Sequence, residues 1–163
     1  LADFGSCSTD TLDYERSNKK EIADKMEQFE RYTTLMYRPP EMIDQYLKFP
    51  VNFQSDIWMI GCILFTLCFA KHPFFEAQKL AIVNAHYFIP DEYNERVGTK
   101  LRDLIWLMLT PDPWKWPTIQ KILSILEDWG ELDAIPLNDI AFEIKKKQME
   151  IIESKNKTKQ IPT

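Results

Sequence analysis

A carboxylate, an aromatic ring and a glycine follow one another near the start of the chain, as Asp3-Phe4-Gly5. The Asp3 carboxylate can hold Mg²⁺ against nucleotide phosphates, because magnesium prefers carboxylate and phosphate oxygens. Phe4 can pack into a core and fix the position of that carboxylate, while Gly5 lets the backbone turn sharply. Three such residues also occur together by chance. The triplet therefore predicts a metal and nucleotide site only if the rest of the sequence agrees with it.

Three longer stretches follow in a fixed order. Thr34 to Glu41 reads TLMYRPPE, Asp56 to Gly61 reads DIWMIG, and Leu109 to Thr118 reads LTPDPWKWPT. They resemble the T-x-x-Y-x-A-P-E, D-x-W-S-x-G and L-x-x-D-P-x-x-R-P-T motifs of serine/threonine protein kinases, and the triplet resembles that family's magnesium-binding motif. Four motifs in the family's order are a strong signal. Over about residues 1–130 the chain is identified as a member of this family.

The resemblance implies a mainly α fold, the C-lobe of a kinase, with the N-lobe absent from this sequence. It implies an activation segment over residues 3–41 and a helical lobe over 42–130, containing the helices that the family letters F to I. Residues 131–163 are expected to form a charged helical extension. The parent protein is expected to use ATP and Mg²⁺ to phosphorylate serine or threonine in protein substrates.

Roles for individual residues also follow from the resemblance. Asp3 would be the metal ligand, and Asp3-Phe4-Gly5 would contact the bound nucleotide. Asp56 would cap its helix and hold the backbone of the catalytic loop, and a plain helix cap is compatible with that role. A loop that receives the substrate is expected to contain Thr34, Tyr37 and Arg38, and the structural positions are Glu41, Asp56, Trp58, Gly61, Asp112 and Trp116. Thr33 and Thr34 are the first candidates for phosphorylation, followed by other loop hydroxyls (Ser6, Ser8, Thr9, Thr11, Ser17), although hydroxyls in a solvated loop are ordinary.

Two positions depart from the family's pattern. Pro39 stands where alanine is usual, and Trp116 stands where the family has the arginine that pairs with Glu41. A buried carboxylate without a partner lowers the stability of the fold by an amount on the order of several kcal/mol, unless the group is protonated or hydrated. Lys115 could reach Glu41 instead, but a lysine cannot reproduce the bidentate fork of an arginine. This departure keeps a second function open, that of a pseudokinase or truncated scaffold acting as a protein-interaction module.

The stretch from Tyr32 to Met42 further resembles the Numb-associated kinases, the group of adaptor-associated and cyclin-G-associated kinases. Met42 to Leu47 could be the extra helix of that group, and Phe88-Ile89-Pro90 resembles its F-x-I-P. This resemblance implies endocytic adaptor proteins as substrates and a cytoplasmic location, peripheral at vesicle membranes. Another branch of serine/threonine kinases is the alternative.

Hydrophobic spacing predicts the elements that would position these residues. Residues 6–31 read as a long loop with a helical turn at Glu21 to Phe29. An apolar helix from Ile57 to Ala70, capped by Ser55 and Asp56, is expected to lie inside the core. Further helices are expected at Glu41 to Leu47, Glu76 to His86, Thr99 to Leu109, Thr118 to Asp128 and Asn138 to Lys155, and no strand is convincing.

The catalytic loop of the family has no counterpart in this chain. The sequence holds no H-R-D motif and, with 4 glycines, no glycine-rich phosphate loop. In the parent protein, both are expected to precede Leu1, so no catalytic residue is expected among the 163 residues. The chain alone is therefore expected to be inactive.

Composition narrows the function classes. The chain is 45% hydrophobic and 28% charged, which is typical of a globular protein, and its net charge of −5 argues against binding nucleic acid. Its longest apolar run is shorter than the roughly 20 residues of a transmembrane helix, so none is expected.

Overall fold

The computed structural model describes residue 5, residues 7–89 and residues 97–129, and these form a largely helical body. The only pairing of extended segments within these ranges is an isolated antiparallel bridge between Leu12 and Val51. The expected mainly α fold is confirmed. The helices are α1 (Lys19–Tyr32), α2 (Pro40–Ile43), α3 (Ser55–Phe69), α4 (Lys79–Val83), α5 (Thr99–Met108) and α6 (Ile119–Asp128), with short 3-10 turns at Leu35–Tyr37, Gln45–Leu47 and Pro113–Lys115.

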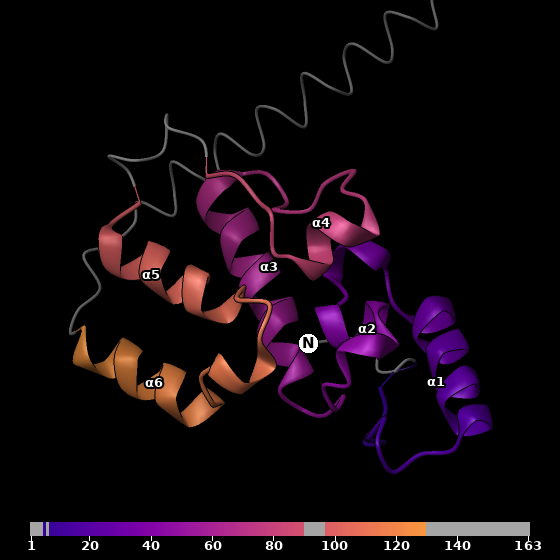
Figure 1. Ribbon diagram of the computed structural model, residues 1–163. Helices are drawn as coiled ribbons and strands as arrows, with labels where there is room; N and C mark the ends of the chain where they lie inside the picture. The colour runs from indigo at the N-terminus through magenta and orange to yellow at the C-terminus, as the bar shows by residue number, and fades with distance from the viewer. Residues whose placement is uncertain (1–4, 6, 90–96, 130–163) are drawn as a thin grey trace, which may run out of the picture.

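Helix α3 occupies the middle of the molecule, with α5 and α6 on one side and α1 and α2 on the other (Figure 1). Its inward side chains, among them Trp58, Cys62 and Phe65, are almost fully buried and form the main hydrophobic core. Burial of such residues is the main force that holds these helices together. The predicted core helix is therefore present, and its bounds agree with the prediction to within two residues at the start and one at the end.

One face of α3 does not follow the prediction of a fully buried helix. Ile60, Ile63 and Leu67 are 43%, 49% and 50% exposed, and they recur at helical spacing. The expectation that this helix lies wholly inside the core is wrong for that stripe, because no described element covers it. The stripe is an apolar surface on the central helix.

Helix α1 corrects the largest error of the sequence reading. The predicted loop is wrong from residue 19 onward, because the expected helical turn at Glu21 to Phe29 is part of a helix of 14 residues, Lys19–Tyr32. The Asn18 side chain accepts hydrogen bonds from the backbone N–H groups of Lys20 and Glu21, and the Glu21 carboxylate accepts one from the Asn18 N–H. This capping box starts the helix. Its inner face, with Ile22, Met26 and Phe29, packs on a second cluster of Leu12, Tyr14, Met42 and Val51.

The boundaries of the other predicted helices differ less from those in the structure. The predicted helix from Glu41 to Leu47 is divided at Asp44, whose side chain accepts from the Tyr46 N–H and starts a separate 3-10 turn. The helix predicted at Glu76 to His86 is confined to α4. The predictions for α5 and α6 are confirmed to within one residue, with Thr118 as the N-cap of α6. The predicted extension at 131–163, including the helix at Asn138 to Lys155, lies outside the described residues.

No helix in the described part of the chain combines the length and the apolar character that crossing a bilayer requires.

Candidate functional site

A hollow of about 410 Å³ lies between α1 and the start of α3. One wall comes from the N-terminal loop and the inner face of α1, and the other comes from the segment after α1 and the turn before α3. Thr34, Tyr37 and Asp56, three of the predicted site residues, line it together. The other lining residues are Cys7, Ser8, Asp10, Thr11, Leu12, Lys25, Gln28, Phe29, Tyr32, Thr33, Met42, Val51, Asn52, Phe53, Ser55 and Met59.

The segment from Thr33 to Tyr37 presents its side chains in different ways. Thr34 is exposed and its hydroxyl makes no cap bond to the 3-10 turn that follows. The Thr33 hydroxyl donates to the Phe29 carbonyl at 2.5 Å, at the last turn of α1. The Tyr37 ring meets the His72 ring edge-on, with 4.4 Å between centroids. Thr34 is thus the exposed threonine of this segment at the lining of the hollow.

Arg38 is turned into the protein. Its side chain is 6% exposed and donates to the Thr33 hydroxyl at 2.7 Å, the Thr33 carbonyl at 2.7 Å and the Glu30 carbonyl at 3.0 Å. Desolvation lowers the pKa of this guanidinium. Arg38 therefore ties the C-terminal end of α1 to the segment before α2. Its predicted contact with a substrate stays a prediction.

Glu41 is the most deeply buried charged residue of the predicted set, with no exposed surface. Its Oε1 accepts a hydrogen bond from the Ser55 hydroxyl at 2.7 Å, and its Oε2 is buried without a partner. Burial raises the pKa of this carboxyl to about 7. The Tyr14 hydroxyl donates to the Glu41 backbone carbonyl at 2.6 Å, and burial raises the Tyr14 pKa. Three distant segments of the chain therefore meet at this glutamate.

The alternative that Lys115 reaches Glu41 in place of the arginine is not what the structure has. The Lys115 ammonium lies 3.6 Å from an Asp112 carboxylate oxygen, in an exposed pair on the same turn. Asp112 also accepts from the Trp114 N–H at 3.0 Å and so starts the 3-10 turn at Pro113–Lys115. A lysine held three residues from its own partner at the surface does not reach the buried carboxyl.

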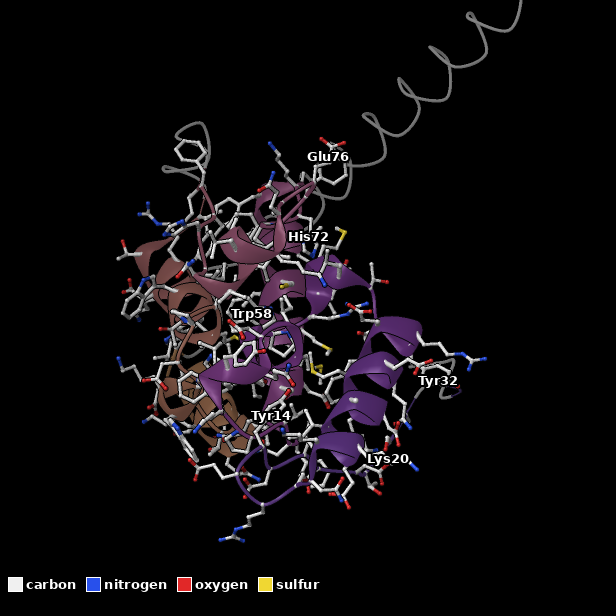
Figure 2. The ribbon with its side chains drawn as sticks, turned by 45° about the vertical axis from the view of Figure 1, so that its right-hand side comes forward. Tyr14, Lys20, Tyr32, Trp58, His72 and Glu76 are labelled. Atoms are coloured by element: carbon white, nitrogen blue, oxygen red, sulfur yellow. The ribbon has the colours of Figure 1, made fainter. Side chains whose placement is uncertain are left out.

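Trp116 is part of an aromatic stack in the core. Its ring centre lies 6.0 Å from that of Trp58, and Trp58 stacks on Phe74 at 5.3 Å with nearly parallel planes. The Trp116 Nε1–H donates to the Thr110 carbonyl at 2.7 Å. Large aromatic groups of this kind contribute packing and a single satisfied polar contact. Figure 2 shows Trp58 near the centre of the molecule, inward of α1.

Asp56 does not cap α3 as predicted. The helix begins at Ser55, its N-cap is Gln54, and that cap makes no side-chain bond. The turn before it is closed instead by the Asn52 side chain, which accepts from the Gln54 N–H at 2.8 Å. Asp56 lies one residue inside the helix, is exposed, and faces the hollow. Its carboxylate is thus available to a group that enters the hollow.

Comparison with known proteins places these features in one family. The protein kinase domain family matches residues 1–126. A probable serine/threonine-protein kinase of Dictyostelium discoideum is 37% identical over 126 residues, which is 77% of this chain and 11% of that protein. The serine/threonine-protein kinase sel-5 of Caenorhabditis elegans is 37% identical over 119 residues, 73% of this chain and 10% of that protein. The chain belongs to the protein kinase domain family.

A second Dictyostelium discoideum relative, also a probable serine/threonine-protein kinase, is 34% identical over 128 residues, 78% of this chain and 15% of that protein. This kinase chain therefore spans only a small part of the length of the curated relatives that it matches. The described residues correspond to the helical lobe that the motifs predicted.

The Asp3-Phe4-Gly5 triplet of this kinase chain is only partly described. Asp3 and Phe4 lie outside the described residues, and Gly5 is exposed. In the part of the chain that the structure describes, no three His, Cys, Asp or Glu side chains gather as a metal site would require. The role of Asp3 as a metal ligand stays a prediction.

Other expectations fall on residues that the structure does not describe. The catalytic loop of the family has no counterpart among the 163 residues, so its expected position in the parent protein stays a prediction. The candidate phosphorylation site Ser6 also lies outside the described residues, as does Pro90 of the segment that resembles F-x-I-P. The site is therefore built from the hollow and the Glu41 contacts alone.

The sequence reading missed Tyr14 altogether and gave Ser55 only the role of a helix cap. Tyr14 lies in a polar loop, and nothing in its spacing signals that its hydroxyl reaches the backbone of Glu41. Figure 2 shows it inward of α1, whereas Lys20 and Tyr32 lie near the two ends of that helix at the surface. Ser55 carried a signal, because a serine one residue before the D-x-W motif has a short hydroxyl suited to a nearby buried carboxyl.

Proposed function

We propose that this chain is the substrate-side lobe of a serine/threonine protein kinase that transfers the γ-phosphoryl group of ATP to protein hydroxyls. The observation that carries the proposal is the joint placement of Thr34, Tyr37 and Asp56 around one hollow. Residues 22 positions apart in sequence meet there, next to the anchored segment at Glu41. Phosphoryl transfer needs mainly positioning and charge stabilisation, and a rigid lobe with an open hollow suits that task.

Each residue has a defined task in this proposal. Asp3 holds Mg²⁺, which when bound neutralises charge on the nucleotide phosphates. Asp56 accepts hydrogen bonds from the backbone of a catalytic loop that enters the hollow. Thr34 and Tyr37 form the edge against which a substrate segment with serine or threonine lies. Arg38 and Glu41 keep that edge in place from behind, through α1 and α3 respectively.

The resemblance of Tyr32 to Met42 to the Numb-associated kinases supports a narrower proposal. The substrates would be threonine-bearing endocytic adaptor proteins, and the kinase would work in the cytoplasm at vesicle surfaces. The stretch from Met42 to Leu47, which the resemblance suggests as the extra helix of that group, contains the end of α2 and the 3-10 turn at Gln45–Leu47. Phosphorylation of a threonine peptide from a clathrin adaptor, at a rate well above that of a scrambled peptide, is the expected result. Equal rates would contradict this narrower substrate class.

A chimera tests the main proposal. Residues 1–126 replace the matching segment of the Dictyostelium discoideum kinase that is 37% identical, so that the host supplies the glycine-rich loop and the catalytic loop. The chimera should phosphorylate serine and threonine in a generic protein substrate, with no phosphotyrosine. A chimera that folds with a cooperative thermal transition but transfers no phosphate, while the host kinase is active, would contradict the proposal.

The 163 residues alone should transfer no phosphate, because they contain neither an H-R-D motif nor a phosphate-binding glycine loop. The measurement is incorporation of labelled phosphate from ATP into a protein substrate by the purified chain. Incorporation above that of a boiled sample would overturn this expectation.

A scaffold without catalytic activity is the second candidate, favoured by the lack of an arginine partner for Glu41. The side chain at the expected arginine position, Trp116, packs in the core at a tilt against Trp58 instead. In the chimera, Trp116→Arg distinguishes the two functions. If the chimera with Trp116 is folded and inactive and Trp116→Arg restores activity, this chain has a scaffold role. If both are active, the kinase function holds.

A further inference from the structure

The carboxyl of Glu41 is held in an environment that favours its neutral form. The side chain has no exposed surface, one oxygen accepts from the Ser55 hydroxyl, and the other oxygen has no partner. A neutral hydroxyl stabilises a carboxylate only weakly, and a buried charge needs an ion pair or several donors. The protonated carboxyl needs fewer hydrogen-bond partners and no ion pair, because it carries no charge into the core.

The titratable and charged groups on the surrounding elements do not supply that charge. On α4 and α1, Lys79 and Glu30 pair with each other at 3.0 Å. Arg38, three residues before Glu41, donates its hydrogen bonds to oxygens of Thr33 and Glu30. Within the described ranges, no cation acts to lower the pKa of Glu41, which burial raises and which hydrogen bonds lower to a smaller extent.

The groups next to the Glu41 backbone and on the first turn of α3 are also neutral or acidic. The Tyr14 hydroxyl donates to the Glu41 backbone carbonyl, and both Glu41 and Asp44 raise the Tyr14 pKa. Asp56, on the same first turn of α3 as Ser55, is exposed, and the Lys115 ammonium pairs with Asp112. An ionised Glu41 would therefore stand among neutral or acidic neighbours.

Glu41 also connects two helices, α2 and α3. It lies in the four-residue helix α2, which contacts α1 and α4, and its side chain reaches across to the first turn of α3. The hollow is lined by Met42 from one side of this contact and by Ser55 from the other. Loosening of the Glu41–Ser55 contact would therefore loosen the wall that carries Thr34 and Tyr37.

We propose that the Glu41 carboxyl is a pH-sensitive anchor, which fastens α2 to α3 when it is protonated and loosens that attachment when it ionises. This regulation rests on the proposed function for its purpose, since it acts on the substrate-side wall of the hollow. The anchor itself is a property of the chain and requires no catalysis. In this chain it takes the place of the ion pair that an arginine at position 116 would form with Glu41.

Amide hydrogen exchange of the 163-residue chain between pH 6 and pH 8 tests the anchor, with rates corrected for the intrinsic effect of pH. The reporters are the Met42 and Asp44 amides, which bond to the Pro39 and Pro40 carbonyls. With a pKa of about 7 in the closed state and 4.5 in the open state, the opening constant should rise about tenfold over this range. The ¹³C resonance of the Glu41 carboxyl should titrate with a midpoint near pH 7.

Variants separate this anchor from a general effect of pH. Glu41→Gln should abolish the tenfold change, whereas Glu27→Gln, an exposed position on α1, should keep it. Ser55→Ala removes the hydrogen bond that lowers the Glu41 pKa, so its pH dependence should be steeper than that of the parent chain. This variant keeps the test decisive if Glu41→Gln does not fold.

A corrected exchange rate at Met42 and Asp44 that is independent of pH, or that changes equally in Glu41→Gln, would overturn the anchor. These readouts require no phosphate transfer. Failure of the anchor would therefore leave the chimera result untouched, and an inactive chimera would leave the anchor untouched.

Discussion

His72 shows at the level of one residue how the core selects a protonation state. Its Nδ1 accepts a hydrogen bond from the Phe74 N–H at 3.0 Å, so the proton of the neutral ring lies on Nε2, which is buried without a partner. A protonated ring would lose the Phe74 bond and add a charge to the aromatic cluster. Burial accordingly lowers the pKa of His72 to about 4.

His72 should destabilise the fold in acid. Its pKa is lower in the folded chain than the 6.5 of the free side chain, so the unfolded state binds the extra proton as pH falls from 6.5 to 4. The free energy of unfolding should fall by roughly 2–3 kcal/mol through this group across that window. His72→Asn keeps an acceptor for the Phe74 N–H but does not titrate. Urea unfolding at pH 7, 6 and 5 should show a shallower acid loss in this variant.

Equal acid losses in the parent and His72→Asn would contradict the account of His72. The Glu41 carboxyl acts in the opposite direction, because its folded pKa is raised and its contribution is lost as pH rises through about 7. The free energies of unfolding of the parent chain and His72→Asn are therefore compared with each other at each pH, because the pH profile of either protein alone also contains the contribution of Glu41.

At the scale of elements, the contact between α3 and α5 depends on Gly61. A Cβ at this position would lie 3.0 Å from the Met108 Cβ and 3.0 Å from the Leu109 Cδ2. The Met108 Cβ cannot move without the backbone of α5, so the glycine permits the two helices to approach closely. This gives a physical reason for the glycine of the D-x-W-S-x-G motif in this chain.

Gly61→Ala should destabilise the chain by about 1–3 kcal/mol, because the added methyl overpacks a tight helix contact. Gly98→Ala is the matched control, since a Cβ there meets nothing within 4 Å. Gly98 is the N-cap of α5, where alanine is a poorer residue, so the control should lose less, up to about 1 kcal/mol. Thermal unfolding of both variants measures the difference. A loss in Gly61→Ala no larger than in Gly98→Ala would refute the close-contact explanation.

Elements with strong local signals were predictable from the sequence, and contacts between distant segments were not. The apolar run of α3 and the spacing in α5 and α6 mark these helices by themselves. Helix α1 has a weaker periodic signal, because its inner face has only Ile22, Met26 and Phe29 among many charges, although Asn18 and Glu21 mark its start with a capping box. Long-range pairs such as Tyr14 with Glu41 have no periodicity, so sequence reasoning could not find them.

The same limit applies to the candidate site. The resemblance predicted Thr34 and Tyr37 in a substrate loop and Asp56 as a structural position, and the structure brings all three to the lining of the hollow. The inward direction of Arg38 and the separate pairing of Lys115 depend on where α1 ends and on how the turn at Asp112 closes. Both are tertiary details that neighbouring residues in the sequence do not specify.

On the scale of the whole molecule, the exposed stripe of Ile60, Ile63 and Leu67 is unusual for a central helix. Contiguous apolar surface of this kind marks a contact site or promotes association. We expect the purified chain to self-associate at micromolar concentrations. The combined variant Ile60→Thr, Ile63→Thr and Leu67→Gln should shift it toward the monomer in sedimentation velocity.

A matched change on another exposed apolar residue, Leu123→Gln on α6, should leave the association unchanged. Equal association of the stripe variant and the parent chain would show that another surface is responsible.

In the proposed kinase, this chain would supply the metal-binding carboxylate of Asp3 and the substrate-side wall of the hollow. The most direct measurement is the rate of phosphate transfer by the chimera with Asp3 and by its Asp3→Asn variant, at saturating ATP and Mg²⁺. We predict that Asp3→Asn lowers kcat on the order of a hundredfold or more, because a charged group that stabilises the transition state is lost. Equal rates in the two proteins would contradict the claim.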